Sequence, residues 1–253
     1  MITRLDHIAI AVPDLAGAVR RYSDMGFDAS LGGDHPGLGT HNAIVRFGLD
    51  YLELIGIRDE EEALASGPSG PVMVDALRRL GGGLLGFVIA STDIAQDCAR
   101  LREHGIEIEP VSMERRRPDG HIFKWKLAAP GGVLWRRPLP FLIEWLTPDA
   151  ERLSLERAGP HPNGAIGISN VHVAVRDLDW CALIYRDALG LGEPIAQARP
   201  DLGAEARRFN VGFHEITLLA PTGEGALAET LKAAGEGPCE FALRFRPPIL
   251  PSK

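Results

Sequence analysis

The sequence repeats one short pattern three times, and this repeat constrains the fold more than any other feature. Each copy is an apolar segment, then an aspartate, then a stretch whose apolar residues recur on one face of a helix. An aspartate at the start of a helix accepts hydrogen bonds from free amide groups of the first turn. We therefore predict a strand followed by an N-capped helix in each copy. The three segments span residues 5–15, 84–94 and 168–178, with aspartates Asp14, Asp93 and Asp177.

The residues after each predicted helix complete the repeated unit. A glycine stands where a left-handed C-terminal cap needs one, at Gly26, Gly105 and Gly190. In the first copy, two β-rich runs at residues 40–47 and 51–57 follow, joined by a short turn. Each copy therefore reads as a β-α-β-β-β unit. Residues 239–245 match the opening strand of a fourth unit, after which the chain ends.

Side chains along the predicted first strand alternate between two faces of the sheet, one that packs on the helix and one that faces away from it. Ile8, Ile10 and Val12 point one way, where a helix can cover them. A curved sheet whose other side carries mostly small or polar residues encloses a space that can hold a ligand. Such residues recur in all three copies: Leu5, His7, Ala9 and Ala11, then Gly86, Val88 and Ala90, then Asn170, His172 and Ala174.

Composition places the chain among soluble globular proteins. Its 253 residues are 45% hydrophobic and 24% charged, which is ordinary for a folded protein of one or two domains. The net charge of −7 argues against a nucleic-acid-binding protein, which normally carries a basic excess. The three cysteines are widely spaced and form no CxxC pair, which fits a reducing compartment. We expect no signal peptide and no membrane span, and predict a cytoplasmic protein.

Two segments carry a resemblance to a known family. One is His35-Pro-Gly-Leu-Gly-Thr-His-Asn42 with the following Tyr51-Leu-Glu-Leu-Ile55, and the other is Leu139-Pro-Phe-Leu-Ile-Glu-Trp145. In these residues and in its repeated unit, the chain resembles the glyoxalase-like domain proteins of the vicinal oxygen chelate superfamily. The resemblance implies that two units pair and that their eight strands form a cupped site.

We therefore predict an α+β fold of tandem β-α-β-β-β units, two of them paired into a cupped eight-stranded sheet. The paired units are placed at residues 1–147, a linker at 148–164, and a third unit with its extra C-terminal strand at 165–253. An unpaired third unit would leave half a cup exposed. We expect it to pack on the first pair or on a second chain, and so predict a homodimer.

The resemblance also implies a metal site, because the superfamily takes its ligands from the first and fourth strands of each paired unit. Carried over by position, the ligands are His7, Glu53 and Glu144, whereas Gly86 stands where the second unit would supply its first-strand ligand. One imidazole and two carboxylates suit a divalent Zn, Ni, Co, Mn or Fe ion. Three side chains hold an ion less tightly than four, so we expect a weakly bound metal.

Four residues are candidates for catalysis. A glutamate released from the metal can move a proton beside a carbonyl, which suggests Glu53 and Glu144. His41 and His121 open the third strand of their units, so the repeat places them at matching mouths of the cup. There they are candidates for substrate contacts or general bases.

The remaining histidines have structural interpretations. His35 and His161 each precede a proline in a turn-like sequence, and we interpret them as loop anchors near the rim. In the third unit, His214 and Glu215 are adjacent and so point to opposite faces of a strand. Only one of the two can share a face with His172, so we expect no second metal site.

Two functions remain open at this point. The first is a divalent-metal-dependent lyase, isomerase or dioxygenase that acts on a small molecule with adjacent oxygens. The second is a metal-free protein of the same fold that binds and sequesters a small, largely apolar ligand. Gly86 favours the second function, and the retained His7 and Glu53 favour the first. We expect the enzyme, with a small molecule as its partner.

Overall fold

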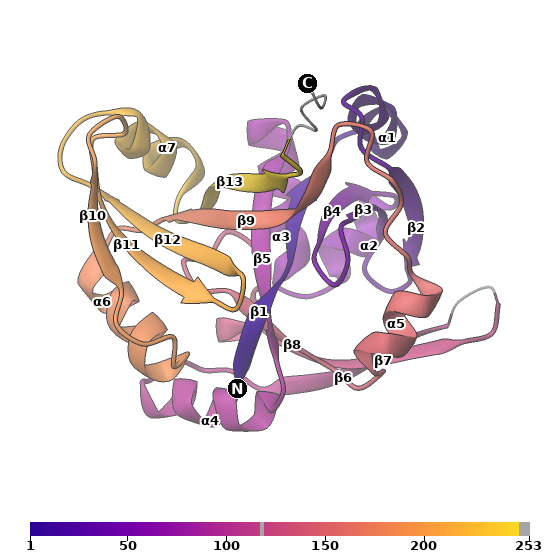
Figure 1. Ribbon diagram of the computed structural model, residues 1–253, viewed down its shortest axis with the longest axis horizontal. Helices are drawn as coiled ribbons and strands as arrows, with labels where there is room; N and C mark the ends of the chain where they lie inside the picture. The colour runs from indigo at the N-terminus through magenta and orange to yellow at the C-terminus, as the bar shows by residue number, and fades with distance from the viewer. Residues whose placement is uncertain (117–118, 248–253) are drawn as a thin grey trace, which may run out of the picture.

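The computed structural model describes residues 1–116 and 119–247, and its strands form two sheets (Figure 1). Eight strands make the larger sheet, in the order β2-β3-β4-β1-β5-β8-β7-β6. This is the order of two β-α-β-β-β units joined through β1 and β5, so the predicted α+β fold with a cupped eight-stranded sheet is confirmed. The strands are β1 (Ile2–Ala11), β2 (Ala29–His35), β3 (Thr40–Arg46), β4 (Tyr51–Ile57), β5 (Gly83–Ser91), β6 (Pro110–Arg116), β7 (Ile122–Ala128) and β8 (Phe141–Trp145).

A helix follows the first strand of each unit, as the repeat predicted. Asp93 and Asp177 cap their helices by accepting a hydrogen bond from the amide three residues further on. Asp14 holds the N-cap position without such a bond. The helices are α1 (Leu15–Asp24), α4 (Ile94–Glu103) and α6 (Leu178–Leu183), the last continuing into a π-helical turn (Ile184–Ala188). The closing glycines all have positive φ: Gly26, Gly105 and Gly190.

The smaller sheet belongs to the third unit and has the order β10-β11-β12-β9-β13. Its last strand pairs antiparallel with β9 as β5 pairs with β1, which is the place predicted for the opening strand of a fourth unit. One helix, α7 (Ala226–Ala234), packs on the inner side of this sheet. The strands are β9 (Ala165–Ala174), β10 (Ile195–Arg199), β11 (Ala204–Val211), β12 (His214–Pro221) and β13 (Gly237–Phe245).

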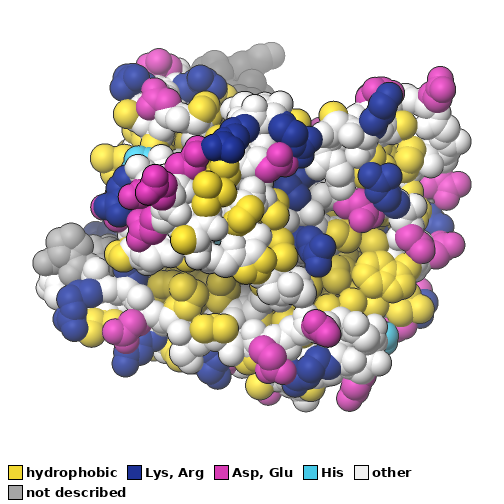
Figure 2. All heavy atoms as spheres, turned by 180° about the vertical axis from the view of Figure 1, so that it is seen from behind, with side chains coloured by type: hydrophobic (Ala, Val, Ile, Leu, Met, Phe, Trp, Pro, Cys, Tyr) yellow, Lys and Arg dark blue, Asp and Glu magenta, His cyan; other side chains and the backbone are white. Residues whose placement is uncertain are grey.

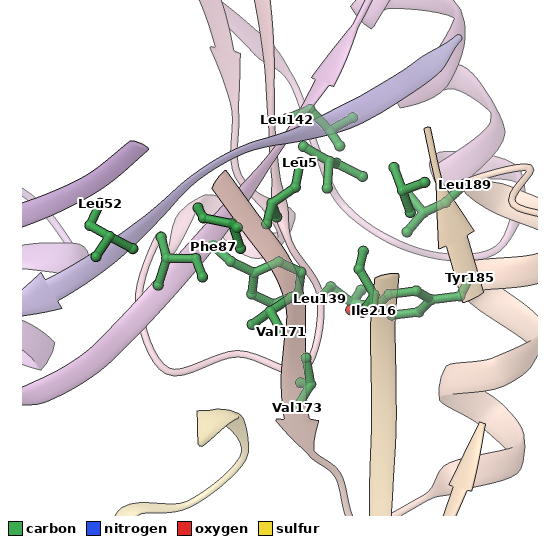
Figure 3. Close-up of a cluster of buried hydrophobic side chains, with 14 of the residues drawn as sticks. Leu5, Leu52, Phe87, Leu139, Leu142, Val171, Val173, Tyr185, Leu189 and Ile216 are labelled. Atoms are coloured by element: carbon green, nitrogen blue, oxygen red, sulfur yellow. The ribbon is translucent and has the colours of Figure 1, made fainter. Parts of the chain in front are cut away.

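The third unit packs on the convex side of the large sheet, so this part of the packing prediction is confirmed. Leu5 and Phe87 of the large sheet share one core with Val171, Val173 and Ile216 of the small sheet (Figure 3). The unit uses its helix-facing side for this contact, so this side is buried against the large sheet.

Arg136 fastens the third unit to the pair of units. It lies in the loop between β7 and β8, and its guanidinium donates hydrogen bonds to carbonyl oxygens on both sides of the contact. These oxygens belong to Leu84, Ala234, Gly235 and Pro238.

Three further helices lie near the inner side of the large sheet. The chain inserts α2 (Glu60–Ala65) and α3 (Ser69–Leu80) between β4 and β5, and α5 (Asp149–Leu155) follows β8. Helix α3 contacts β1 and β5, α2 packs on α3, and Arg152 of α5 lies over Trp145 of β8. Met73 of α3 packs against Ala9 and Ile55 on the inner side of the sheet. Among the described residues, no helix is long and apolar enough to cross a membrane.

Candidate functional site

A β-bulge in β1 brings two adjacent polar residues together. The register of β1 against β5 pairs Leu5 with Ile89 and His7 with Val88, so Asp6 has no partner residue across the sheet. Leu5 belongs to the core on the convex side, whereas His7 lies on the inner side of the cup. The expectation that Leu5 shares the inner side is wrong, because the bulge shifts the alternation by one residue.

His7 connects the carboxylates of Asp6 and Glu53. Its Nδ1 lies 2.9 Å from Oδ1 of Asp6, and its Nε2 lies 3.6 Å from Oε2 of Glu53. In the neutral imidazole, the bond to Asp6 keeps the proton on Nδ1 and leaves the Nε2 lone pair toward Glu53. The side chains of His7 and Glu53 are 7% and 13% exposed, so the pair lies on the shielded floor of the cup.

Asp6 supplies a fixed negative charge behind this imidazole. Burial by itself would raise the pKa of Asp6, but the hydrogen bond with His7 and the charges of Arg4, His7 and Arg152 hold it well below its usual range. The indole Nε1 of Trp145 also donates a hydrogen bond of 3.0 Å to Oδ2 of Asp6. A carboxylate behind a histidine orients the ring and stabilises its protonated form.

Two aromatic rings hold the imidazole in place. Tyr51 stacks on His7 with 4.5 Å between ring centroids, and Phe141 meets its ring edge-on at 5.9 Å. Burial, followed by the charges of Asp6 and Glu53, raises the pKa of Tyr51 well above its usual value. The phenol therefore stays protonated beside the two carboxylates.

The second oxygen of Glu53 faces two other residues. Asn42 donates a hydrogen bond of 2.6 Å to Oε1, and Nε2 of His35 lies 3.9 Å from the same atom. Nδ1 of His35 in turn lies 2.9 Å from Oγ1 of Thr40. His35 is thus both the loop anchor that the sequence predicted and a neighbour of the His7–Glu53 pair.

The structure does not bring Glu144 to this pair. Its Oε2 lies 3.3 Å from Nζ of Lys126 and 3.4 Å from the backbone nitrogen of Ile94, at the start of α4. Leu142, two residues earlier in β8, belongs to the convex core, and alternation puts Glu144 on the same side. A carboxylate at a helix N-terminus stabilises that helix, which accounts for an acid within an apolar strand.

The two predicted mouth histidines also lie away from the pair. His41 is opposite Gly56 on the neighbouring strand. A Cβ added to Gly56 would lie 2.8 Å from Nε2 of His41 and 3.3 Å from Cβ of Leu15 in α1, so the imidazole and the helix lie on the same side of the sheet. His41 therefore faces the helix rather than the cup. His121 precedes β7 with its side chain 52% exposed, and its Nδ1 lies 3.3 Å from Asp119.

The three predicted metal ligands consequently do not converge. Of the three, only His7 and Glu53 lie together, and residues 1–116 and 119–247 contain no group of three His, Cys, Asp or Glu able to hold a metal ion. The position of the missing ligand is filled as well, since a Cβ on Gly86 would lie 3.0 Å from the Leu134 oxygen and 3.1 Å from the Trp135 ring. The donor set therefore does not fit the metal site that the resemblance implied.

Arg152 of α5 is a further buried charge near the site. Its side chain is 1% exposed, its guanidinium stacks 3.5 Å from the ring centroid of Trp145, and it donates a 3.0 Å hydrogen bond to Asp149. Within the described part of the chain, its Nε and Nη2 have no hydrogen-bond partner. Burial lowers the pKa of Arg152, while the charges of Asp6 and Tyr51 raise it.

The other histidines contact backbone groups or acidic side chains outside the site. His161 bonds through both ring nitrogens to backbone groups of the first unit. Nε2 of His214 lies 3.4 Å from Asp50 in the contact between the two sheets. His172 pairs across the sheet with Thr217, so alternation puts it on the face opposite to His214.

A mostly apolar pocket of about 640 Å³ lies near the cup, although neither His7 nor Glu53 is among its lining residues. Its walls come from α2 and α3 on one side, and from β6, β7 and the following loop on the other. Figure 2 shows this face of the molecule, where hydrophobic side chains lie in a hollow. Thr40, the partner of His35, is among the lining residues and connects the pocket to the pair.

Two β-α-β-β-β units pair through β1 and β5 around an inner site, which is the arrangement that the resemblance to glyoxalase-like proteins implied. The model of the glyoxalase-like domain family matches residues 5–189, and the chain belongs to that family. The match extends beyond the paired units to the first strand and the helix of the third.

Two solved structures with TM-scores above 0.6 show the same fold. A hypothetical protein from Staphylococcus aureus is 15% identical with a TM-score of 0.65, over 89% of each chain. A mutant of 4-hydroxymandelate synthase from Streptomyces coelicolor is 16% identical with a TM-score of 0.63, over 96% of this chain and 71% of the other. Methylmalonyl-CoA epimerase from Mycobacterium tuberculosis is 25% identical with a TM-score of 0.40, over 56% and 88%. No curated protein matches the chain.

Proposed function

We propose that the chain is an enzyme that moves a proton on a small organic molecule, as a lyase or an isomerase. The observation that carries this proposal is the contact sequence Asp6–His7–Glu53 on the floor of the cup. A dioxygenase would need a redox-active metal, for which the described residues offer two ligands in one place rather than three. Proton transfer needs only the residues that are there.

The geometry suggests how the residues divide the work. Nε2 of His7 takes a proton from the substrate carbon beside a carbonyl, and the electron pair moves into the resulting enolate. Asp6 stabilises the imidazolium that forms, because its carboxylate stays charged against Nδ1. Glu53 then carries the proton from Nε2 to a neighbouring atom of the substrate, with Asn42 holding its other oxygen. The proton is returned, so an isomerisation needs no further reactant.

The alternative is a binding protein that sequesters a small apolar ligand without changing it. Two observations favour this alternative: the apolar pocket of about 640 Å³ and the loop with Trp135 that covers Gly86. Both functions use the same cup, so an experiment has to separate turnover from binding.

Hydrogen–deuterium exchange provides that experiment. The protein is incubated in D2O with a panel of small ketones, hydroxyketones and keto acids, and loss of the carbon-bound proton is followed by NMR. We expect exchange in at least one compound, and its loss in His7→Gln and Glu53→Gln. The control variant Glu144→Gln, whose carboxylate lies on the convex side, keeps the exchange.

Two outcomes would contradict the proposal. Ligand binding without exchange anywhere in the panel would favour the sequestering protein. Exchange that vanishes in EDTA and returns only with a divalent metal would show that His7 and Glu53 do not act alone.

A further inference from the structure

The pocket has a mostly apolar lining, although Thr40, Ser66 and Ser69 also line it. Its walls include Leu38, Met73, Val111, Leu127 and Trp135. A volume of about 640 Å³ lies within the range of sites that enclose small organic ligands. The interior therefore has room for an apolar body of that size.

The wall made by α2 and α3 is fixed by specific contacts. Ser69, at the start of α3, accepts a 3.0 Å hydrogen bond from the backbone nitrogen of Leu134, next to Trp135. The two helices also touch closely, since a Cβ on Gly70 would lie 1.8 Å from the carbonyl oxygen of Ala63. Helix α3 is thus held in place by a hydrogen bond to the loop after β7 and by close packing on α2.

The charged lining residues are of one sign. Glu107 and Glu109 are exposed at the mouth, and no lysine or arginine is among the described lining residues. Arg102 pairs with Glu109 at 2.6 Å, which leaves the carboxylate of Glu107 as the excess charge. A phosphate or sulfonate at this mouth would meet the carboxylate of Glu107, and no described lining residue is positively charged.

Two chains of contacts connect the pocket with the proposed catalytic pair. Thr40 lines the pocket and lies 2.9 Å from His35, whose other ring nitrogen is 3.9 Å from Glu53. On the opposite wall, the ring of Trp135 meets Phe141 at 5.7 Å, and Phe141 meets the imidazole of the pair at 5.9 Å. On each wall a single residue separates the pocket from the pair: His35 on one and Phe141 on the other.

We propose that the pocket holds the uncharged, apolar body of the substrate, and that its acidic mouth rejects substrates attached to a phosphorylated carrier. This inference rests on the proposed enzyme function and names the substrate class: a free small molecule with a polar end and an apolar body. The apolar walls of the pocket select an apolar body, and the carboxylate at its mouth selects against an anion.

Binding of N-phenyl-1-naphthylamine, a neutral fluorescent probe, tests the pocket. Val111 lines the pocket on edge strand β6, and Val111→Trp narrows the pocket. The matched control is Leu31→Trp on β2, the other edge strand, because Leu31 is also an exposed aliphatic side chain. We expect the Kd to rise at least tenfold in Val111→Trp and to stay unchanged in Leu31→Trp. An unchanged Kd in Val111→Trp, or no binding to the wild type, would overturn the inference.

The charge of the mouth is tested with 1-anilinonaphthalene-8-sulfonate, which adds a sulfonate to the same rings. We expect the wild type to bind it at least tenfold more weakly than the neutral probe. The double variant Glu107→Gln/Glu109→Gln should reduce this difference and leave binding of the neutral probe unchanged. Equal affinities for both probes in the wild type would refute the selectivity of the mouth.

The pocket and the catalytic proposal can fail separately. His7 does not line the pocket, so His7→Gln should bind the neutral probe as the wild type does. If exchange is absent while the probe binds as expected, the catalytic proposal alone is refuted. For a compound that exchanges, Val111→Trp should raise KM with little effect on kcat, and an unchanged KM would refute the pocket assignment alone.

Discussion

The carboxylate of Asp6 lies 2.9 Å from Nδ1 of His7, although the two residues are neighbours in one strand. In a regular strand, adjacent side chains point to opposite faces of the sheet. The β-bulge between β1 and β5 removes this restriction and lets the two side chains contact each other. The same bulge keeps Leu5 in the convex core, so one irregularity serves the packing and the site together.

Asp6→Asn tests this relationship. The substitution keeps the shape but removes the charge behind His7, so we expect exchange activity to fall about a hundredfold or more. Arg152 would lose a compensating charge in a buried position, and unfolding should become easier by about 3 kcal/mol. Exchange rates and urea denaturation measure the two effects.

Asp14→Asn is the matched control, because Asp14 caps α1 without a side-chain hydrogen bond and asparagine caps equally well. Wild-type activity in Asp6→Asn would mean that the charge behind His7 has no part in the reaction.

The fold followed from the sequence to a large extent. The strand, capping aspartate, helix and closing glycine recur locally, and these local rules predicted the repeated β-α-β-β-β unit, whereas the pairing of two units into an eight-stranded cup came from the resemblance. The placement of His7 and Glu53 on the inner side of the sheet was also predicted, because alternation and the resemblance agree at these two positions.

The rest of the site depended on contacts that a sequence does not reveal. Asp6 joins the site only because of the bulge, and Arg152 comes from a helix in the predicted linker, where no periodic pattern marked it. Glu144 was assigned to the cup by position, but alternation from Leu142 puts it beside α4. The insertion α2–α3, which forms one wall of the pocket, likewise had no counterpart in the repeated unit.

Arg136→Ala tests how the third unit is held. The change leaves carbonyl oxygens of Leu84, Ala234, Gly235 and Pro238 without this donor. Since hydrogen bonds to a charged group are worth about 1.5–3 kcal/mol each and compensate one another in part, we expect a loss of about 3 kcal/mol in unfolding free energy. Urea denaturation followed by circular dichroism measures this loss.

Arg137→Ala, a change of the adjacent exposed arginine, should alter the unfolding free energy by less than about 0.5 kcal/mol. Equal effects of the two substitutions would show that Arg136 is not an anchor of the third unit.

Asp50 makes the contact between the two sheets dependent on pH. Burial alone would raise the pKa of Asp50, but hydrogen bonds from His214 and from the amide of Ile168 lower it below its usual value. A lowered pKa stabilises the folded state above the unfolded-state pKa, and this contribution is lost as the pH falls through the folded-state pKa.

The wild type should therefore be more stable than Asp50→Asn at pH 7, and the difference should shrink as the pH falls below about 4. Urea midpoints of both proteins between pH 7 and pH 2.5 give the comparison. A difference that stays constant across this range would mean that the charge of Asp50 does not stabilise the contact.

Gly86 allows a direct test of whether the loop above it closes the position of the missing ligand. Because Trp135 and the Leu134 oxygen fill the space above this glycine, Gly86→His should overpack the inner side and destabilise the fold by about 1–3 kcal/mol. It should also fail to create a metal site, since the new ring has no room toward His7 and Glu53.

Adding Trp135→Ala removes the obstructing ring, so the double variant should bind Ni²⁺ through the introduced imidazole together with His7 and Glu53. Titration calorimetry with Ni²⁺ compares wild type, Trp135→Ala, Gly86→His and the double variant. Binding by Gly86→His alone would show that the loop is not what closes this position. Ni²⁺ binding by Trp135→Ala alone would show that His7 and Glu53 hold the ion once the loop is opened. A third ligand at position 86 would then be unnecessary.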